Sequence, residues 1–213
     1  MPEKATTRQM IRVLEILADT YPEARCALHF DGPWQLLVAT ILSAQCTDRQ
    51  VNLVTGPLFQ RFPNPDAMAG ADQGELENLI RSTGFFRNKA ANLIACAAAL
   101  LQRHAGQVPE RMEDLVALPG VGRKTANVVL GNAFSVPGLA VDTHVRRVSW
   151  RLGWTKQTDP VRIEQDLCPR LPTERWTMAS HLLIHHGRAI CRASRPACHS
   201  CPVLALCPRT GVA

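Results

Sequence analysis

The chain has 213 residues and a formal net charge of +6; 46% of its residues are hydrophobic and 20% are charged. These proportions are typical of a folded globular protein and exclude an intrinsically disordered chain. The basic balance favours a polyanionic partner, although many basic proteins bind no nucleic acid.

The sequence contains no recognisable targeting segment. Its first ten residues lack the apolar core of a signal peptide, and no stretch reaches the roughly 18 uninterrupted apolar residues that a membrane helix needs. We therefore expect no membrane partner and a reducing location, the cytoplasm of a bacterial-type cell. Disulfides are rare there, so a metal-binding role gains weight for the eight cysteines.

Helical periodicity begins near the N-terminus. Apolar residues recur at helical spacing over residues 10–17, and Tyr21-Pro22 ends that helix. Asp31-Gly32-Pro33 offers a cap and a first-turn proline for the apolar run 34–42. We expect that run to be buried on nearly every side.

Further helices follow along the chain. Residues 90–101 are rich in alanine and leucine, and Pro109 opens a short helix that ends at Leu118. Asp159-Pro160 and Pro172-Thr173 are typical helix starts, the second leading into residues 176–190. Strand-like alternation and internal repeats are absent from the sequence. The predicted fold class is all-α.

A glycine-containing corner with the sequence LPGVGRKTA spans residues 118–126. Gly120 and Gly122 flank one apolar residue, which suits a tight turn that approaches a ligand closely. The first N–H groups of the following helix are unpaired, and the helix dipole adds partial positive charge, so a phosphate fits there. An ordinary helix corner with a glycine cap is the alternative.

Lys124 stands at the start of that following helix, beside Arg123. The helix dipole and the neighbouring cation both disfavour a protonated amine, and a neutral amine is what a nucleophile requires. A lysine that only contacts phosphate would occupy the same place. Position alone leaves both roles open.

Asp142 lies 18 residues after Lys124, within the sequence VDTHV. Capping a helix is the ordinary role of an aspartate in this setting. Asp142 could also stabilise positive charge that develops on a sugar, or help to move a proton at the lysine. The roles are compatible, because a capping carboxylate is held rigidly.

Four cysteines near the C-terminus follow the pattern C-x6-C-x2-C-x5-C. They are Cys191, Cys198, Cys201 and Cys207. Four thiolates can hold a [4Fe–4S] cluster. Zinc is the alternative, although its four-cysteine sites usually show two close-spaced pairs and only one is present here.

Such a cluster would add a formal charge of −2, so the net charge would fall from +6 to about +4. It would not attract DNA by itself. We expect it to fold a basic loop in which Arg188, Arg192 and Arg195 contact phosphates. A redox role stays open.

The remaining cysteines and a histidine pair have ordinary interpretations. Cys26, Cys46, Cys96 and Cys168 are expected to be buried as small hydrophobes. His181 and His185 have the i, i+4 spacing of a zinc motif, but its glutamate is missing. We interpret them as a structural or DNA-facing pair.

Together these motifs resemble the endonuclease III family, helix-hairpin-helix DNA glycosylases with a C-terminal iron–sulfur loop. The resemblance covers nearly the whole chain. It rests on LPGVGRKTA and VDTHV, on LSAQCTD at 42–48, TGFF at 83–86 and IHHGR at 184–188, and on the terminal cysteines.

The resemblance implies a bifunctional DNA glycosylase and abasic-site lyase of base excision repair. Its partner would be double-stranded DNA containing oxidised pyrimidines or abasic sites, and its cofactor a [4Fe–4S] cluster. Lys124 would attack C1′ of a flipped nucleotide, and β-elimination of the Schiff base would cleave 3′ to the abasic site. We expect a monomer associated with the nucleoid.

The resemblance also assigns contacts to the lesion. Gln45 would fill the space that the base vacates, and Phe85 stands where the family often has an aliphatic wedge. Ser43 and His144 are candidate pocket residues, and the hairpin residues Gly120, Gly122 and Arg123 would bind phosphate.

Two rival functions remain. One is a monofunctional mismatch glycosylase, and the other is a non-catalytic iron–sulfur DNA-binding protein. Adenine-removing relatives carry a glutamate in the helix before the glutamine, whereas residues 37–42 contain no carboxylate. Thymine-mismatch relatives tend to carry tyrosine in place of Lys124, so this lysine favours strand cleavage.

Two helical domains flanking an active-site cleft are expected from the same resemblance. Residues 26–136 would form a helical barrel that carries the hairpin. Residues 1–25 would join residues 137–213 to form the cluster domain.

Overall fold

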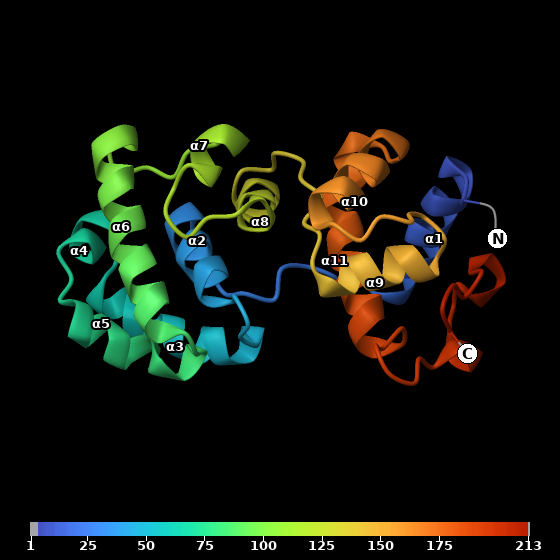
Figure 1. Ribbon diagram of the computed structural model, residues 1–213, viewed down its shortest axis with the longest axis horizontal. Helices are drawn as coiled ribbons and strands as arrows, with labels where there is room; N and C mark the ends of the chain where they lie inside the picture. Colours follow the sequence, from blue (N-terminus) through green and yellow to red (C-terminus); the bar gives the residue numbers. More distant parts are fainter. Residues whose placement is uncertain (1–3, 213) are drawn as a thin grey trace. The chain divides into compact units, whose positions relative to one another are not determined.

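The computed structural model describes residues 4–212. Within this range the backbone forms α-helices and short 3₁₀ helices, and it contains no β-strand (Figure 1). The prediction of an all-α fold is confirmed. None of the helices in this range is long and apolar enough to span a bilayer.

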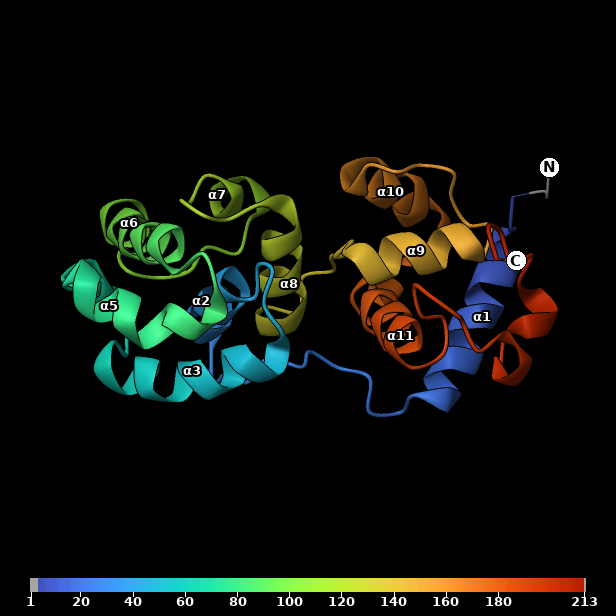
Figure 2. The same cartoon turned by 60° about the horizontal axis from the view of Figure 1, so that its bottom comes forward.

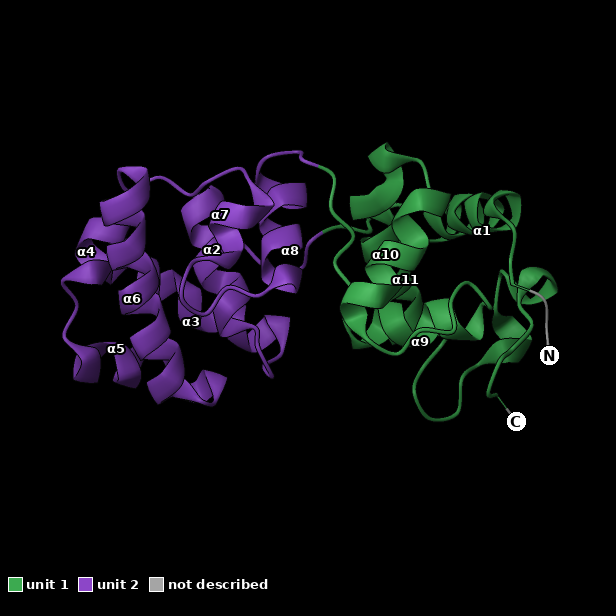
Figure 3. Cartoon of the chain, turned by 45° about the horizontal axis from the view of Figure 1, so that its top comes forward, with its two compact units in different colours: residues 1–25, 137–213 green, residues 26–136 purple. Residues whose placement is uncertain are grey.

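The chain divides into two compact units, each with its own apolar core (Figure 3). One unit is Cys26–Val136. The other combines Met1–Arg25 with Pro137–Ala213.

The unit Cys26–Val136 contains seven α-helices and one 3₁₀ helix. They are α2 (Pro33–Leu42), α3 (Asp48–Arg61), α4 (Pro65–Ala69), α5 (Gln73–Ile80), η1 (Arg81–Thr83), α6 (Phe86–His104), α7 (Met112–Val116) and α8 (Arg123–Ala133). Helix α2 is the central element, because every residue from Leu36 to Leu42 is buried. It packs against α8, α3 and α6, while α6 also packs on α4 and α5 (Figures 1 and 2).

The described part of the second unit has four α-helices and four short 3₁₀ helices. They are α1 (Thr7–Thr20), α9 (Thr143–Arg151), α10 (Pro160–Leu167), η2 (Cys168–Arg170), η3 (Thr173–Arg175), α11 (Trp176–Ala189), η4 (Cys198–Ser200) and η5 (Leu204–Leu206). Helix α11 packs against both α9 and α1. Their apolar faces enclose Trp154, which is 1% exposed.

Most helix starts agree with the local sequence rules. Asp159 caps α10 through a hydrogen bond from the N–H of Arg162, and Pro160 occupies the first turn. Tyr21 is the C-cap of α1, and the apolar run 34–42 is largely buried. These predictions are confirmed.

One further predicted start is confirmed and one is wrong. Gly32 is the N-cap of α2 and Pro33 occupies its first turn, as Asp31-Gly32-Pro33 predicts. Pro109 does not open a helix, because α7 begins only at Met112 and ends at Val116. The helix predicted over residues 90–101 is longer at both ends.

The apolar core can be tested with two leucines of one helix. Leu58 and Leu53 both lie on α3, with exposures of 0% and 64%. Leu58→Ala should lower the free energy of unfolding by about 2–5 kcal/mol, since it removes buried methyl groups and leaves a cavity. Leu53→Ala should change it by less than about 0.5 kcal/mol. Urea denaturation followed by circular dichroism measures both; equal effects would contradict this assignment of the core.

Candidate active site and cysteine pocket

The turn before α8 is built around one left-handed glycine. Leu118 and Val121 are buried and anchor the turn, and the Val121 N–H donates to the Leu118 carbonyl at 3.1 Å. Between them Gly120 has φ +76°, and a β-carbon there would lie 2.9 Å from Cβ of Asn92. Only glycine combines this backbone conformation with this close approach.

The start of α8 has no side-chain cap and carries two cations. Its N-cap, Gly122, has an extended backbone and makes no side-chain capping bond. The N–H groups of the first turn therefore have no acceptor within the helix or from the cap residue's side chain. Arg123 and Lys124 are both exposed in this turn. Such a helix start can bind an anion.

The charge of Lys124 acts on the thiol of Cys26. Burial is the main cause that raises the pKa of this thiol; a backbone hydrogen bond at Leu28 lowers it, the charge of Asp48 raises it and that of Lys124 lowers it. The two opposite charges thus act on one thiol of this unit. Sequence reasoning missed this group, because the three residues are far apart along the chain.

Asp142 lies in the other unit and caps α9. Its Oδ1 accepts a hydrogen bond from the N–H of Val145 at 2.8 Å, and the side chain is half-buried. The predicted capping role is confirmed. The capping bond fixes the carboxylate at the first turn of α9.

His144 follows Asp142 in the first turn of α9. Burial lowers its pKa; Asp142 opposes this effect, and the charges of Arg147 and Arg188 add to it. Its Nδ1 lies 3.1 Å from Nη2 of Arg147. A hydrogen bond with the Gly187 backbone also opposes the effect of burial on the His144 pKa.

Two predicted lesion contacts, Gln45 and Phe85, lie on loops with unusual backbone. Both have left-handed dihedrals, with φ +52° and +49°, and Phe85 is 63% exposed. The Ser43 hydroxyl, in contrast, donates to the Thr40 carbonyl at the end of α2. The structure thus presents Gln45 and Phe85 at the surface and directs Ser43 back to its own helix.

Lys89, on α6, joins these two loops. Its ammonium is buried and donates to the carbonyls of Leu42 and Thr83, each at 2.8 Å. Burial lowers its pKa, while the nearby Cys46 thiol opposes that shift. Sequence reasoning missed this residue, since a lysine in an alanine-rich helix gives no sign of being buried.

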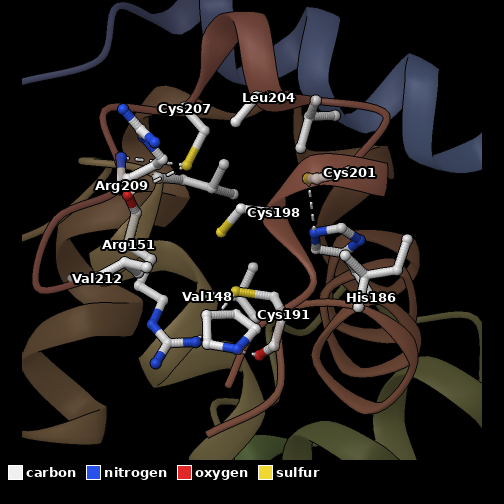
Figure 4. Close-up of a pocket in the computed structure, with 14 residues that line it drawn as sticks. Val148, Arg151, His186, Cys191, Cys198, Cys201, Leu204, Cys207, Arg209 and Val212 are labelled. Carbon is white, nitrogen blue, oxygen red and sulfur yellow. Dashed lines mark hydrogen bonds between the residues drawn. The ribbon is translucent and has the colours of Figure 1, made fainter. Parts of the chain in front are cut away.

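The four C-terminal cysteines line one pocket, and Figure 4 shows them around the same space. Apolar walls come from Val148, Leu152 and Val203, and Arg151 and His186 also line the pocket. Several hydrogen-bond donors reach the sulfur atoms. The Arg209 N–H lies 3.4 Å from Cys207 Sγ, and Nη1 of Arg151 lies 3.5 Å from Cys191 Sγ.

His186 contacts a third thiol. It is buried, and its Nε2 lies 3.6 Å from Cys201 Sγ, while Nδ1 lies 3.1 Å from the Tyr21 hydroxyl. Burial lowers the pKa of His186 to about 4. N–H donors around thiolates are typical of iron–sulfur sites. Across residues 4–212, no set of three or more His, Cys, Asp or Glu side chains is arranged around a single metal ion.

The loop that begins at Cys191 is held by arginines of α9. Arg151 donates to the carbonyls of Arg192 and Ala193 at 2.7 and 2.9 Å, and Arg147 donates to that of Cys191 at 3.1 Å. These bonds leave the side chains of Arg192 and Arg195, with that of Arg188, exposed. Sequence reasoning did not identify Arg147 or Arg151.

The other four cysteines differ in burial, although all were expected to be buried. Cys96 is buried, and burial raises its pKa to about 12. Cys26, Cys46 and Cys168 are only partly buried, so the prediction that all four are buried is wrong for these three. Of the histidine pair, His181 has a pKa lowered to about 4 by burial and by His185, which suits a structural role.

The chain matches the HhH-GPD superfamily base excision DNA repair proteins over residues 38–172. It is 54% identical over 197 residues to Endonuclease III of Synechocystis sp., a match that covers 92% of this chain and 90% of the relative. Two solved structures are similar, each with a TM-score of 0.92 and 44% identity over 96% of this chain. They are a non-covalent Endonuclease III–DNA complex, covered to 96%, and a trapped Endonuclease III–DNA covalent intermediate, covered to 97%.

The turn before α8 can be tested with its two glycines. Gly120→Ala should lower the free energy of unfolding by about 1–3 kcal/mol, because alanine is strained at positive φ and its β-carbon meets Asn92. Gly122→Ala should change it by less than about 1 kcal/mol, since the backbone is extended and the space is open. Guanidinium denaturation measures both, and a larger loss from Gly122→Ala would refute this geometry.

Proposed function

Because the chain belongs to the endonuclease III family of HhH-GPD base excision DNA repair proteins, we propose that Lys124 is the nucleophile with which it removes oxidised pyrimidines from double-stranded DNA. The chain is a bifunctional DNA glycosylase and abasic-site lyase. Its partner is DNA. The proposal adds the lesion class and the residues that carry the chemistry.

The observation that carries this proposal is the place of Lys124 among only four lysines in the sequence. Lys4 forms an ion pair with Asp166, and Lys89 is buried between two carbonyls. Lys156 is exposed but lies in the loop between α9 and α10. Lys124 is an exposed amine in the first turn of α8, beside the open N–H groups that suit a DNA phosphate.

The proposed reaction has two stages. The Lys124 amine attacks C1′ of the lesion nucleotide, the bond from C1′ to the base nitrogen breaks, and the damaged base leaves. The sugar ring opens to a Schiff base on Lys124. Loss of a 2′ proton and departure of the 3′ phosphate then cleave the strand by β-elimination.

Asp142 is proposed to stabilise the positive charge that develops on the sugar and to receive a proton from Lys124. Its capping bond to the Val145 N–H supports this role, because it holds the carboxylate in one orientation. His144 is a pocket residue in this proposal, in the first turn of α9 beside Asp142.

The remaining residues are proposed to bind and open the DNA. Gly120, Gly122 and Arg123 would hold a phosphate at the start of α8. Gln45 and Phe85 would enter the base stack, and Ser43 would line the lesion pocket. Arg192 and Arg195 would bind the DNA backbone from the loop that Arg147 and Arg151 hold, and Arg188 would bind it from the end of α11.

A [4Fe–4S] cluster is proposed as the cofactor, bound by Cys191, Cys198, Cys201 and Cys207. The fit rests on four thiols around one pocket with apolar walls and N–H donors directed at the sulfur atoms. When bound, the cluster would supply covalent ties between segments that bury little apolar surface. Arg151 and Arg147 would orient the loop that carries Cys191.

The unit Cys26–Val136 is proposed to serve as the helical barrel domain, and the other unit as the cluster domain. A monomer suffices for the proposed reaction, because one chain carries both Lys124 and Asp142. We propose that the protein acts in the cytoplasm, associated with the nucleoid that holds its substrate.

The nucleophile is tested by trapping. Borohydride should trap the wild-type protein covalently on duplex DNA that contains thymine glycol, because it reduces the Schiff base to a stable amine. Lys124→Gln should abolish the trapped species, while Lys156→Gln, the matched exposed lysine, should retain it. Denaturing gel electrophoresis measures the product.

An undiminished trap in Lys124→Gln would contradict the assignment of the nucleophile. Base release by the wild type without any trapped species would instead show a monofunctional glycosylase. Salt-sensitive DNA binding without lesion processing would show a non-catalytic protein.

The cofactor is tested by metal analysis. Protein purified without oxygen should absorb broadly in the visible range and contain about four iron atoms and about four sulfides per chain. Cys198→Ser should lose most of this iron, and Cys168→Ser, outside the pocket, should keep it. Stoichiometric zinc in a colourless, iron-replete preparation would overturn the proposal.

A further inference from the structure

Lys89 is a buried cation whose hydrogen-bond partners are backbone carbonyls. It is 5% exposed, and its Nζ donates to the carbonyls of Leu42 and Thr83, which are 47 and 6 residues away in the sequence. Burying an ammonium group is unfavourable, and methionine would fill the same space without a charge to desolvate. We therefore attribute the presence of a charged residue at this buried position to the two carbonyls that it binds.

Each carbonyl lies just before one of the two left-handed residues. Leu42 ends α2 and precedes Gln45 by three positions, and Thr83 ends η1 and precedes Phe85 by two. Left-handed backbone at residues other than glycine is strained, so the surroundings must hold it in place. Lys89 bonds to the entry of both loops at once.

A second bond crosses between the same two loops at the surface. The Gln50 side-chain amide, in the first turn of α3, donates to the hydroxyl of Ser82 on η1 at 2.8 Å. Gln50 follows the Gln45 loop and Ser82 precedes Phe85. One buried and one exposed connection thus join the two segments: their contacts at Leu42 and Gln50 flank Gln45 in the sequence, and those at Ser82 and Thr83 both precede Phe85.

We propose that Lys89 is a positioning residue that fixes the spacing between the Gln45 loop and the Phe85 loop, so that both side chains enter the DNA base stack together. The inference rests on the proposed function, in which these two side chains displace bases. In this proposal the two loops act together when a base is extruded from the stack. Lys89 itself touches neither DNA nor the reacting atoms.

If Gln45 and Phe85 must enter the base stack together, two activities of the protein should respond differently to the loss of Lys89. A lesion paired within a duplex must be extruded before C1′ is exposed, whereas an abasic site in single-stranded DNA has no base to extrude and no partner strand. Loss of Lys89 should therefore impair the first activity and spare the second. A loss of stability alone would lower both together.

The experiment compares Lys89→Met with Thr55→Val, a control that changes a buried residue of the same unit away from both loops. Lys89→Met should lower the single-turnover rate of thymine glycol release from duplex DNA by about tenfold or more. Borohydride trapping on single-stranded abasic DNA should change by less than about twofold. Thr55→Val should leave both within about twofold.

A spectroscopic signal tests the loops without any base release. 2-Aminopurine placed opposite a tetrahydrofuran abasic analogue in a duplex should brighten when the wild type unstacks it, and much less with Lys89→Met at saturating protein. If Lys89→Met does not fold, Lys89→Gln, which keeps one donor group, serves in the same assays and should give the same selective loss.

Three outcomes would overturn the proposal: parallel loss of both activities, no loss of either, or an unchanged aminopurine signal. Failure of the proposed nucleophile is a separate result. It would appear as a trap that persists in Lys124→Gln, and it would leave the aminopurine comparison intact.

Discussion

The start of α8 is the constraint on which the function depends, because its N–H groups are open only if no side chain caps them. Gly122 has no side chain to do so; α2, α6, α7 and α11 also begin without a side-chain cap, whereas α1, α3, α4, α5, α9 and α10 have one. The left-handed turn at Gly120, packed against Asn92, brings the chain into this start. Phosphate binding and the presentation of Lys124 both follow from these two glycines.

Buried or partly buried cations on the helices donate to backbone carbonyls and so hold the loops that carry function. Lys89 does this for the loops of Gln45 and Phe85. In the other unit, Arg147 and Arg151 do it for the loop that begins at Cys191. Every residue has a backbone carbonyl, so these hydrogen bonds do not require particular side chains in the loop. The exposed side chains of the loop are therefore available for contacts with DNA.

The features that could be predicted from the sequence are those that depend on local interactions, such as helix periodicity and helix capping. Periodicity identified the buried helix 34–42, and capping rules located Asp142 and Asp159, because these effects act within one or two turns. The helix start predicted at Pro109 was wrong, because proline occurs in loops and turns as well as in the first turn of a helix. The roles of Lys89 and Arg151 could not be predicted, because each binds a carbonyl at a distant point of the sequence, 47 and 41 residues away, and every residue has a carbonyl.

The central claim is that Lys124, and no other amine of the chain, forms the covalent bond to DNA. The direct measurement is peptide mapping by mass spectrometry of wild-type protein reduced with borohydride on abasic DNA. The account predicts the sugar remnant on the peptide that contains Lys124. A remnant on Lys4, Lys89, Lys156 or the N-terminal amine would contradict it.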